Sequence, residues 1–305
     1  MTTQRDSFFD KLFELAKENR DIILISADMG APSLDRFRKE LPDQYVDCGI
    51  AEQSAILTAV GLAKAGKKCF MYAIAPFCVY RILEQIRINL CGMNLPITIC
   101  GVGAGMSYDD SGPTHHETEG IAQLRCLPNI RIHNITDPIM ARYYAEASVG
   151  FDYPNYIRLD RQANDILYGD TNDFSKGYLA DCDVDNDLTI IATGNMAHIG
   201  REIQKELSCN FVDVFEFPIN NSLIAELESE GCYNIVTLEE HVLPGGLGSA
   251  MLEAVNDVSC ADFTVLRFGL DFSAGFCYQY GGREELQKAY GIDKASILRR
   301  IEEWV

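Results

Sequence analysis

The stretch Val46-Asp47-Cys48-Gly49-Ile50-Ala51-Glu52-Gln53 carries an acidic side chain from the end of a short strand to the start of a helix. The helix is predicted over 52–64, because apolar residues such as Ile56 and Val60 recur there at helical spacing. A glutamate in the first helical turn is favoured by the helix dipole, so its position alone is explained by helix stability. A ligand-binding role for Glu52 therefore depends on the residues around it.

Outward from this stretch, short β-branched apolar runs alternate with amphipathic segments, which is typical of βαβ units and a mostly parallel sheet. Strands are predicted over 21–26, 67–73, 95–102 and 155–159, and helices over 52–64, 79–90 and 138–148. After a polar stretch, strands are predicted over 188–194, 210–215, 233–240 and 263–269, helices over 196–207, 221–229 and 246–255, and two helical segments at the end. We therefore expect an α/β protein with two domains, 1–161 and 187–305, whose mostly parallel sheets are flanked by helices. The polar stretch 162–186 is expected to link them and to hold one short strand at most.

The charge and composition of the chain exclude several classes of partner. Its 305 residues carry a formal net charge of −19, which would repel nucleic acid and anionic membranes. No apolar run reaches the roughly 18–20 residues that span a bilayer, and the N-terminal segment lacks the apolar core of a secretory signal. The eleven cysteines are scattered without a Cys-x-x-Cys pair and are interpreted as buried reduced thiols. We expect a cytoplasmic protein.

A second informative block is Tyr72-Ala-Ile-Ala-Pro-Phe77-Cys-Val-Tyr80-Arg81, which places aromatic residues on the loop and first turn after a predicted strand. In an open α/β sheet, ligands bind beyond the carboxyl ends of the strands, where this loop would lie. Phe77 and Tyr80 would there stack on a flat heterocycle. Packing beneath the loop explains them nearly as well.

A third block, Tyr108-Asp-Asp-Ser-Gly-Pro-Thr-His115-His116-Glu117, places two adjacent histidines after a turn. Histidine is the side chain best suited to proton transfer near neutral pH. Adjacent side chains on a helix or strand diverge, and no cysteine or acid follows at a ligand spacing, so no metal is expected to bind this chain there.

Several motifs resemble, in order and spacing, the C-terminal half of transketolase and of its relative 1-deoxy-xylulose-5-phosphate synthase. In the first predicted domain they are GIAEQ (49–53), SGPTHH (111–116) and LRCLPN (124–129). In the second they are LTIIATGNMAHIG (188–200), LEEHVLPGGLGSA (238–250) and YGIDKASIL (290–298). The resemblance covers nearly the whole chain.

This resemblance implies a set of roles in thiamine diphosphate chemistry. The acid matching Glu52 hydrogen-bonds the aminopyrimidine ring and promotes the tautomer that deprotonates the thiazolium carbon. Phe77 and Tyr80 are expected to stack on the pyrimidine, and Asp28 is included among the expected cofactor-binding residues. His115 is expected to face the substrate and exchange protons with its oxygens. The implied reaction transfers a two-carbon ketol unit from a ketose to an aldose, with the cofactor as electron sink.

The sequence departs from the family at the expected substrate site. Ser111 stands where transketolases carry an acid before Gly-Pro-Thr-His, and Gly103 replaces the family's phosphate-contacting histidine. Arg161 matches the family's phosphate-binding arginine, a role that suits bidentate chemistry, although a surface or linker-anchoring arginine is the alternative. The resemblance therefore leaves open a modified or non-phosphorylated substrate, such as a sulfo-sugar, a nucleotide-linked sugar or a branched sugar.

One half of the cofactor site is missing from this sequence. The superfamily binds Mg²⁺ and the diphosphate through a Gly-Asp-Gly stretch with a later asparagine, and no Gly-Asp-Gly occurs here. We expect a separate N-terminal-type subunit to hold the diphosphate and Mg²⁺, in a heterotetramer of two chains of each kind. The glycine-rich turn Pro244–Gly248 is interpreted as close helix–sheet packing and not as a phosphate cradle. Glu240 and His241 beside it are expected to be structural.

Other functions remain open at this point. The β subunit of a 2-oxoacid dehydrogenase shares the implied fold and the glutamate, and a deoxy-xylulose-phosphate-synthase-like condensation would require pyruvate and release CO₂. A non-catalytic assembly subunit is the alternative from another class. The joint presence of Glu52, Phe77 and His115 favours an enzyme.

Overall fold

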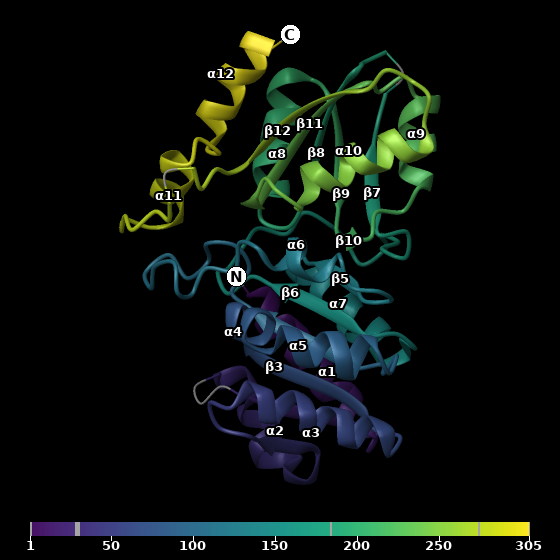
Figure 1. The fold of residues 1–305 in the computed structure, drawn as a ribbon, viewed down its shortest axis with the longest axis vertical. Coiled ribbons are helices and arrows are strands. Elements are labelled where there is room, and N and C mark those ends of the chain that lie inside the picture. Colours follow the sequence, from purple (N-terminus) through teal and green to yellow (C-terminus); the bar gives the residue numbers. More distant parts are fainter. Residues whose placement is uncertain (1, 28–30, 184, 274, 305) are drawn as a thin grey trace. The chain divides into compact units, whose positions relative to one another are not determined.

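The computed structural model describes residues 2–27, 31–183, 185–273 and 275–304 (Figure 1). Two compact units account for these residues. The first comprises Met1–Ala104 with Gln123–Asp170, and the second comprises Gly105–Ala122 with Thr171–Val305. Helix α6 (Gly120–Leu124) spans the point in the sequence where one unit gives way to the other.

The first unit is built on a parallel sheet whose neighbouring strands follow the order β5-β6-β4-β3-β1-β2. The strands are β1 (Ile22–Ser26), β2 (Tyr45–Asp47), β3 (Lys68–Ile74), β4 (Thr98–Val102), β5 (Arg131–Asn134) and β6 (Asn155–Leu159). Strands β1, β4 and β6 are buried along their whole length, which is why they read as continuous apolar runs and not as alternating ones.

The first unit also contains helical segments. They are α1 (Gln4–Glu18), η1 (Pro32–Leu34), α2 (Asp35–Glu40), η2 (Pro42–Gln44), α3 (Glu52–Lys64), α4 (Ala75–Val79), η3 (Tyr80–Ile82), α5 (Leu83–Gln85), η4 (Ile86–Cys91), α7 (Pro138–Ala147) and η5 (Ser148–Gly150). Helix α1 packs with α7, and α3 packs on β3. The predicted regular helix over 79–90 is instead a chain of short α, 3-10 and π turns running through 75–91.

The carboxyl ends of the central strands are level with one another. Ser26 of β1 pairs with Asp47 of β2 on one side and with Tyr72 of β3 on the other. The backbone N–H of Cys48 donates to the Ser26 carbonyl at 2.9 Å, which extends the pairing past the end of β2. The turns that follow β2 and β3 therefore start from neighbouring positions on one edge of the sheet.

The second unit holds a sheet in the order β12-β11-β8-β9-β7, parallel except for the edge strand β7, which is antiparallel to β9. Its strands are β7 (Tyr178–Asp181), β8 (Leu188–Ala192), β9 (Asn210–Val214), β11 (Asn234–Val242) and β12 (Thr264–Leu270), and β10 (Glu216–Phe217) follows β9 in the chain. Its helices are α8 (Met196–Leu207), α9 (Ser222–Ser229), α10 (Leu247–Val258), α11 (Arg283–Ala289) and α12 (Lys294–Trp304). The expected α/β class with mostly parallel sheets is confirmed.

The segment 105–122 packs with the C-terminal unit although it follows β4 of the first. The two units therefore differ from the expected domain ranges 1–161 and 187–305. Those ranges divide the chain by its sequence and stay a prediction. Strand β7 is the short strand allowed for within the expected linker 162–186. The grouping matters because this segment carries both histidines of the third sequence block.

Candidate functional site

Glu52 is delivered to its position by a tight turn after β2. Gly49 adopts φ +61°, a conformation that glycine enters without steric cost, and its N–H donates to Asp47 Oδ1 at 2.9 Å. Helix α3 then begins at Glu52 itself. The glutamate is only 2% exposed, so its carboxylate must find a partner within the protein.

That partner is Arg81 of η3. Its Nη1 lies 2.8 Å from both Oε1 and Oε2 of Glu52, while the arginine side chain remains 45% exposed. The guanidinium thus compensates the buried charge from the solvent side. A buried carboxylate whose counter-charge is reachable from solvent can exchange that partner for a ligand more readily than a fully enclosed ion pair.

Arg81 also covers Phe77. The guanidinium carbon lies 4.4 Å from the centroid of the Phe77 ring, within the range of a cation–π contact. Glu52, Phe77 and Arg81 form one group, which we call the carboxylate–aromatic cluster. Tyr80, another expected cofactor residue, is half-buried in η3 next to Arg81 in sequence.

The cluster shows which chemistry this place accommodates. A flat group with N–H donors sits against the carboxylate and over an aromatic ring. An aminopyrimidine has the same two properties, namely a planar π system and an N–H donor on its edge. The cluster therefore fits a heterocycle of that kind in place of the guanidinium.

Residues 105–117, which we call the histidine loop, form the second candidate group and belong to the C-terminal unit. Its two ends are joined by a bridge in which the N–H of Gly105 donates to the Glu117 carbonyl at 3.0 Å and the reverse bond is 2.9 Å. Within the loop, His116 is 8% exposed, and its Nε2 donates to the Tyr108 carbonyl at 3.2 Å. Burial lowers the pKa of His116, and the opposing effects of that hydrogen bond and of nearby acids are smaller. The ring is therefore neutral, and its hydrogen bond joins two parts of the loop.

His115 is the more exposed of the two histidines. Its Nδ1 lies 3.0 Å from Thr114 Oγ1, and its ring centroid is 5.7 Å from that of Tyr108. Ser111, also half-buried, donates from Oγ to Asp110 Oδ1 at 2.9 Å. The structure thus assigns different environments to His115 and His116, and His115 is the one that suits contact with a substrate.

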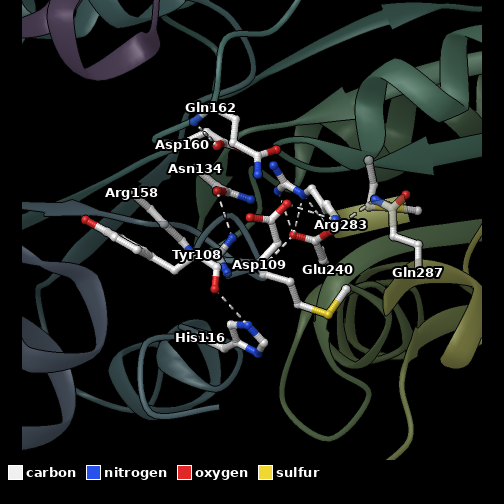
Figure 2. Close-up of polar contacts among 12 residues, drawn as sticks. Tyr108, Asp109, His116, Asn134, Arg158, Asp160, Gln162, Glu240, Arg283 and Gln287 are labelled. Carbon is white, nitrogen blue, oxygen red and sulfur yellow. Dashed lines mark hydrogen bonds and ion pairs between the residues drawn. The ribbon is translucent and has the colours of Figure 1, made fainter. Parts of the chain in front are cut away.

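The histidine loop contacts Glu240 of β11, which Figure 2 shows beside Arg283. Oε2 of Glu240 accepts the N–H of Met106 at 2.8 Å and a 2.6 Å bond from Nη2 of Arg283. Gln287 Nε2 donates to the other oxygen at 3.0 Å. Burial alone would raise the pKa of Glu240, but the charge and hydrogen bonds of Arg283, with those of Met106 and Gln287, outweigh burial and hold this pKa below its usual value.

Arg161 and Gly103 lie in the first unit. Arg161 follows β6 and is half-buried, and its neighbour Asp160 accepts the N–H of Gln162 at 2.8 Å. Gly103 follows β4, is buried, and adopts φ +111°, with its N–H donating to the Leu159 carbonyl at 2.8 Å. A histidine at this position would have to take up a backbone conformation that residues with a side chain avoid.

The structure brings together some expected residues and not others. Glu52 and Phe77 meet through Arg81 in the first unit, and Ser111 and His115 share the histidine loop. Asp28 lies outside the described residues. Neither Arg81 nor Glu240 is expected from the sequence to serve the site. The sequence signal for Arg81 is its place four residues after Phe77 in the second block.

In the glycine-rich turn after β11, a carboxylate of the same chain already accepts hydrogen bonds from the backbone amides. Glu239, fully buried, accepts the N–H of Leu247 at 2.6 Å and of Gly248 at 2.9 Å. A Cβ at Gly248 would lie 2.8 Å from Thr237 Oγ1 of the sheet. These contacts agree with the expected close helix–sheet packing, and the helix N-terminus is satisfied by a carboxylate of the same chain.

The cysteines are thiols that take no part in disulfides. Six are buried, namely Cys69, Cys78, Cys91, Cys100, Cys209 and Cys232, whereas Cys126 and Cys260 are exposed and the other three are half-buried, so burial does not extend to all of them. Burial raises the pKa of Cys69 to about 12. Within the described ranges, no helix is long and apolar enough to cross a bilayer, and no three His, Cys, Asp or Glu side chains gather as a metal site.

Two family models match the chain. The model described as the transketolase pyrimidine binding domain matches residues 2–165, and that of the transketolase C-terminal domain matches residues 179–297. The carboxylate–aromatic cluster lies within the first match.

Among curated relatives, a subunit of the apulose-4-phosphate transketolase of Phocaeicola vulgatus is 32% identical, and the match covers 100% of this chain and 98% of the relative. A 6-deoxy-6-sulfo-D-fructose transketolase subunit of a Clostridium species is 26% identical over 98% of this chain and 93% of its own. The 1-deoxy-D-xylulose-5-phosphate synthase of Halothermothrix orenii is 33% identical over 97% of this chain, which spans only 47% of that enzyme.

Solved structures share the architecture. A split-gene transketolase in the form of an inactive β4 tetramer matches with a TM-score of 0.84 and 27% identity over 99% of this chain and 97% of its own. The transketolase of Campylobacter jejuni matches with a TM-score of 0.77 at 18% identity, covering 99% of this chain and 46% of that enzyme, and shows a common fold.

Proposed function

The chain belongs to the transketolase family, and we propose that it supplies the pyrimidine-recognising part of a thiamine-diphosphate-dependent transketolase whose diphosphate-binding part is a separate subunit. The complex would transfer a two-carbon ketol unit from a ketose to an aldose. The observation that carries this proposal is the buried Glu52 carboxylate, which meets a planar N–H donor stacked on Phe77.

The division into two subunits is supported by the lengths of the relatives. This chain matches almost the full length of proteins named as transketolase subunits, but less than half of the single-chain synthase and transketolase. We propose a partner that carries the Gly-Asp-Gly stretch and holds Mg²⁺ with the diphosphate, in a heterotetramer of two chains of each kind.

The family depends on thiamine diphosphate, and the carboxylate–aromatic cluster fits its pyrimidine half. Glu52 would hydrogen-bond the ring edge, and Phe77 with Tyr80 would offer aromatic faces. Asp28 remains a proposed cofactor residue. When bound, the cofactor supplies the electron sink on which a ketol unit is carried. The protein residues orient the ring and hold a proton at the Glu52 carboxyl.

Arg81 has to release Glu52 when the ring binds, because the guanidinium uses both carboxylate oxygens and lies over the Phe77 face. Its substantial exposure leaves it room to turn towards solvent. In this proposal, Arg81 keeps the buried carboxylate paired until the cofactor is bound.

On the substrate side, His115 would contact the sugar oxygens, with Ser111 on the same loop and Arg161 as an anion-binding group. Gly103 adopts a backbone conformation that suits glycine and not histidine. This favours a substrate site whose backbone differs from that of the family, and not one that differs by a single side chain. We therefore propose a donor other than an ordinary sugar phosphate, such as a sulfonated, branched or nucleotide-linked sugar. Two relatives are named for apulose 4-phosphate and for a sulfo-fructose, which supports a modified sugar.

The test uses this chain co-expressed with a partner that carries the Gly-Asp-Gly stretch, purified as a complex. A panel of ketose donors with a small aldehyde acceptor is assayed for ketose consumption and for CO₂. We expect ketose turnover without CO₂. We also expect Glu52→Gln to lower kcat by about 100-fold or more, because an amide cannot exchange a proton with the edge of the ring as the carboxyl group does. Release of CO₂ from pyruvate would favour the synthase-like or dehydrogenase reaction. Full activity of Glu52→Gln would favour an assembly subunit.

A further inference from the structure

We propose that Glu240 and Arg283 are positioning residues, which hold the histidine loop from the C-terminal unit and thereby fix His115 for the reaction. This inference rests on the proposed function only for the role of His115. The attachment of the loop is a property of the described contacts within one unit.

The first attachment is at the base of the loop. Oε2 of Glu240 accepts the Met106 N–H, which is a loop amide with no part in the sheet. Gly105 makes room for this contact, because a Cβ there would overlap Oε2 of Glu240. Gly105 also bridges to Glu117 at the other end of the loop, so one carboxylate fixes both ends.

The second attachment comes from Arg283, the first residue of α11. Its backbone N–H donates to Asp109 Oδ2 at 3.0 Å, which holds the loop three residues beyond Met106. Its side chain binds Glu240 in a bidentate manner, with Nε 2.9 Å from Oε1 and Nη2 2.6 Å from Oε2. Arg283 therefore orients Glu240 and contacts the loop directly, as Figure 2 shows.

The burial and charge of this group make the attachment stiff. Glu240 is 4% exposed and Arg283 is 8% exposed, and Gln287 Nε2 provides a further bond to Oε1 at 3.0 Å. Hydrogen bonds to an ionised carboxylate are stronger than those between neutral groups. The depressed pKa of Glu240 agrees with a carboxylate that stays charged. The Glu240 carboxylate thus fixes the Met106 amide, and Arg283 and Gln287 in turn hold the carboxylate.

The neighbouring Glu239 offers a matched control. It is also buried on β11, and its carboxylate accepts the first amides of α10, those of Leu247 and Gly248. Replacing each glutamate by glutamine removes one charge and keeps the size of the side chain. We expect both changes to lower stability, and the change at Glu240 to act on the loop through the Met106 amide.

Hydrogen–deuterium exchange on the full chain tests the attachment without reference to activity. We expect Glu240→Gln to raise exchange across 105–117 by about 10-fold or more, and Glu239→Gln to raise it at the start of α10 instead. The double variant Glu240→Gln/Arg283→Gln leaves no unpaired buried charge, so it serves if the single variant folds poorly. Unchanged exchange across 105–117 in both Glu240 variants overturns the attachment.

Kinetics of the complex test the consequence for His115. A loop that is displaced by about 1 Å lowers kcat by up to about 100-fold, while the affinity for thiamine diphosphate, measured by calorimetry, stays unchanged. In a His115→Ala background, Glu240→Gln should cause no further loss of kcat. Additive losses, or equal losses for Glu239→Gln, overturn the positioning role. An inactive wild-type complex contradicts the proposed function instead, and the exchange experiment then decides whether the loop is attached through Glu240.

Discussion

Glu52 and Arg81 place a buried charge and its counter-charge against the face of Phe77. At the scale of single residues, this contact would link stability to the proposed function, because the same carboxylate is paired in the free chain and, in our proposal, is available to a cofactor ring. An arginine that is 45% exposed can satisfy both requirements. The sequence predicts Glu52 and Phe77 as cofactor residues, which stays a prediction, whereas their connection through Arg81 depends on how η3 turns towards α3.

Arg81→Met is expected to destabilise the free chain by about 1–3 kcal/mol, because Glu52 then lacks a partner for its buried charge. Thermal unfolding measures this loss, and Arg87→Met, an exposed arginine of the same helical stretch, serves as the control. The complex with Arg81→Met should bind thiamine diphosphate at least as tightly as the wild type, since the guanidinium no longer competes for Glu52. Binding weaker by more than about tenfold, which is roughly 1.4 kcal/mol, would contradict this role.

His133 is a second buried residue with a measurable consequence. It packs between the rings of Tyr144 and Phe151, and burial lowers its pKa to about 3. In the unfolded chain its pKa returns to about 6.5, so the unfolded state takes up a proton that the folded state does not. The contribution of His133 to the free energy of unfolding is therefore fully present above about pH 6.5, and it falls as the pH is lowered towards 3.

His133→Phe should reduce this acid sensitivity. Between pH 7 and 5, the wild type should lose about 2 kcal/mol of unfolding free energy through His133, and the variant should lack that part of the loss. Urea unfolding at several pH values measures the difference. Parallel pH curves for the two proteins would show that His133 does not carry the effect.

At the scale of elements, the regular strands and helices follow from the sequence, because buried parallel strands require continuous apolar runs and surface helices require an apolar stripe. Two features do not follow in this way. The stretch 75–91 alternates between α, 3-10 and π turns, which an apolar periodicity cannot distinguish. The histidine loop is held by Glu240 and Arg283, which are 43 residues apart, and no local pattern pairs them.

The turn after β4 also yields a prediction. Gly103→His would place the family's histidine in a backbone with φ +111°, at a cost of about 1–3 kcal/mol. We expect a lower melting temperature and no gain in kcat/KM with a phosphorylated ketose. Gly150→Ala, at an exposed glycine without positive φ, is the control. A stable variant with improved use of the phosphorylated donor would show that the turn accepts the histidine.

At the scale of the whole molecule, the chain combines two α/β units and, in our proposal, carries the residues for one half of a cofactor. The sequence indicates this through ordered motifs and through the missing Gly-Asp-Gly stretch. It does not indicate that the histidine loop packs with the C-terminal unit, because that assignment depends on contacts between residues far apart in the chain. The C-terminal unit thus holds a loop that the sequence alone assigns to the other domain.

The need for a partner is tested most directly by calorimetric titration of thiamine diphosphate with Mg²⁺ into this chain alone and into its complex with the diphosphate-binding subunit. We predict tight binding by the complex, with one cofactor for each pair of chains. The chain alone should bind at least about 100-fold more weakly, a difference of roughly 2.7 kcal/mol, because it offers only the pyrimidine contacts. Equally tight binding by the chain alone would contradict the division of the cofactor site between two subunits.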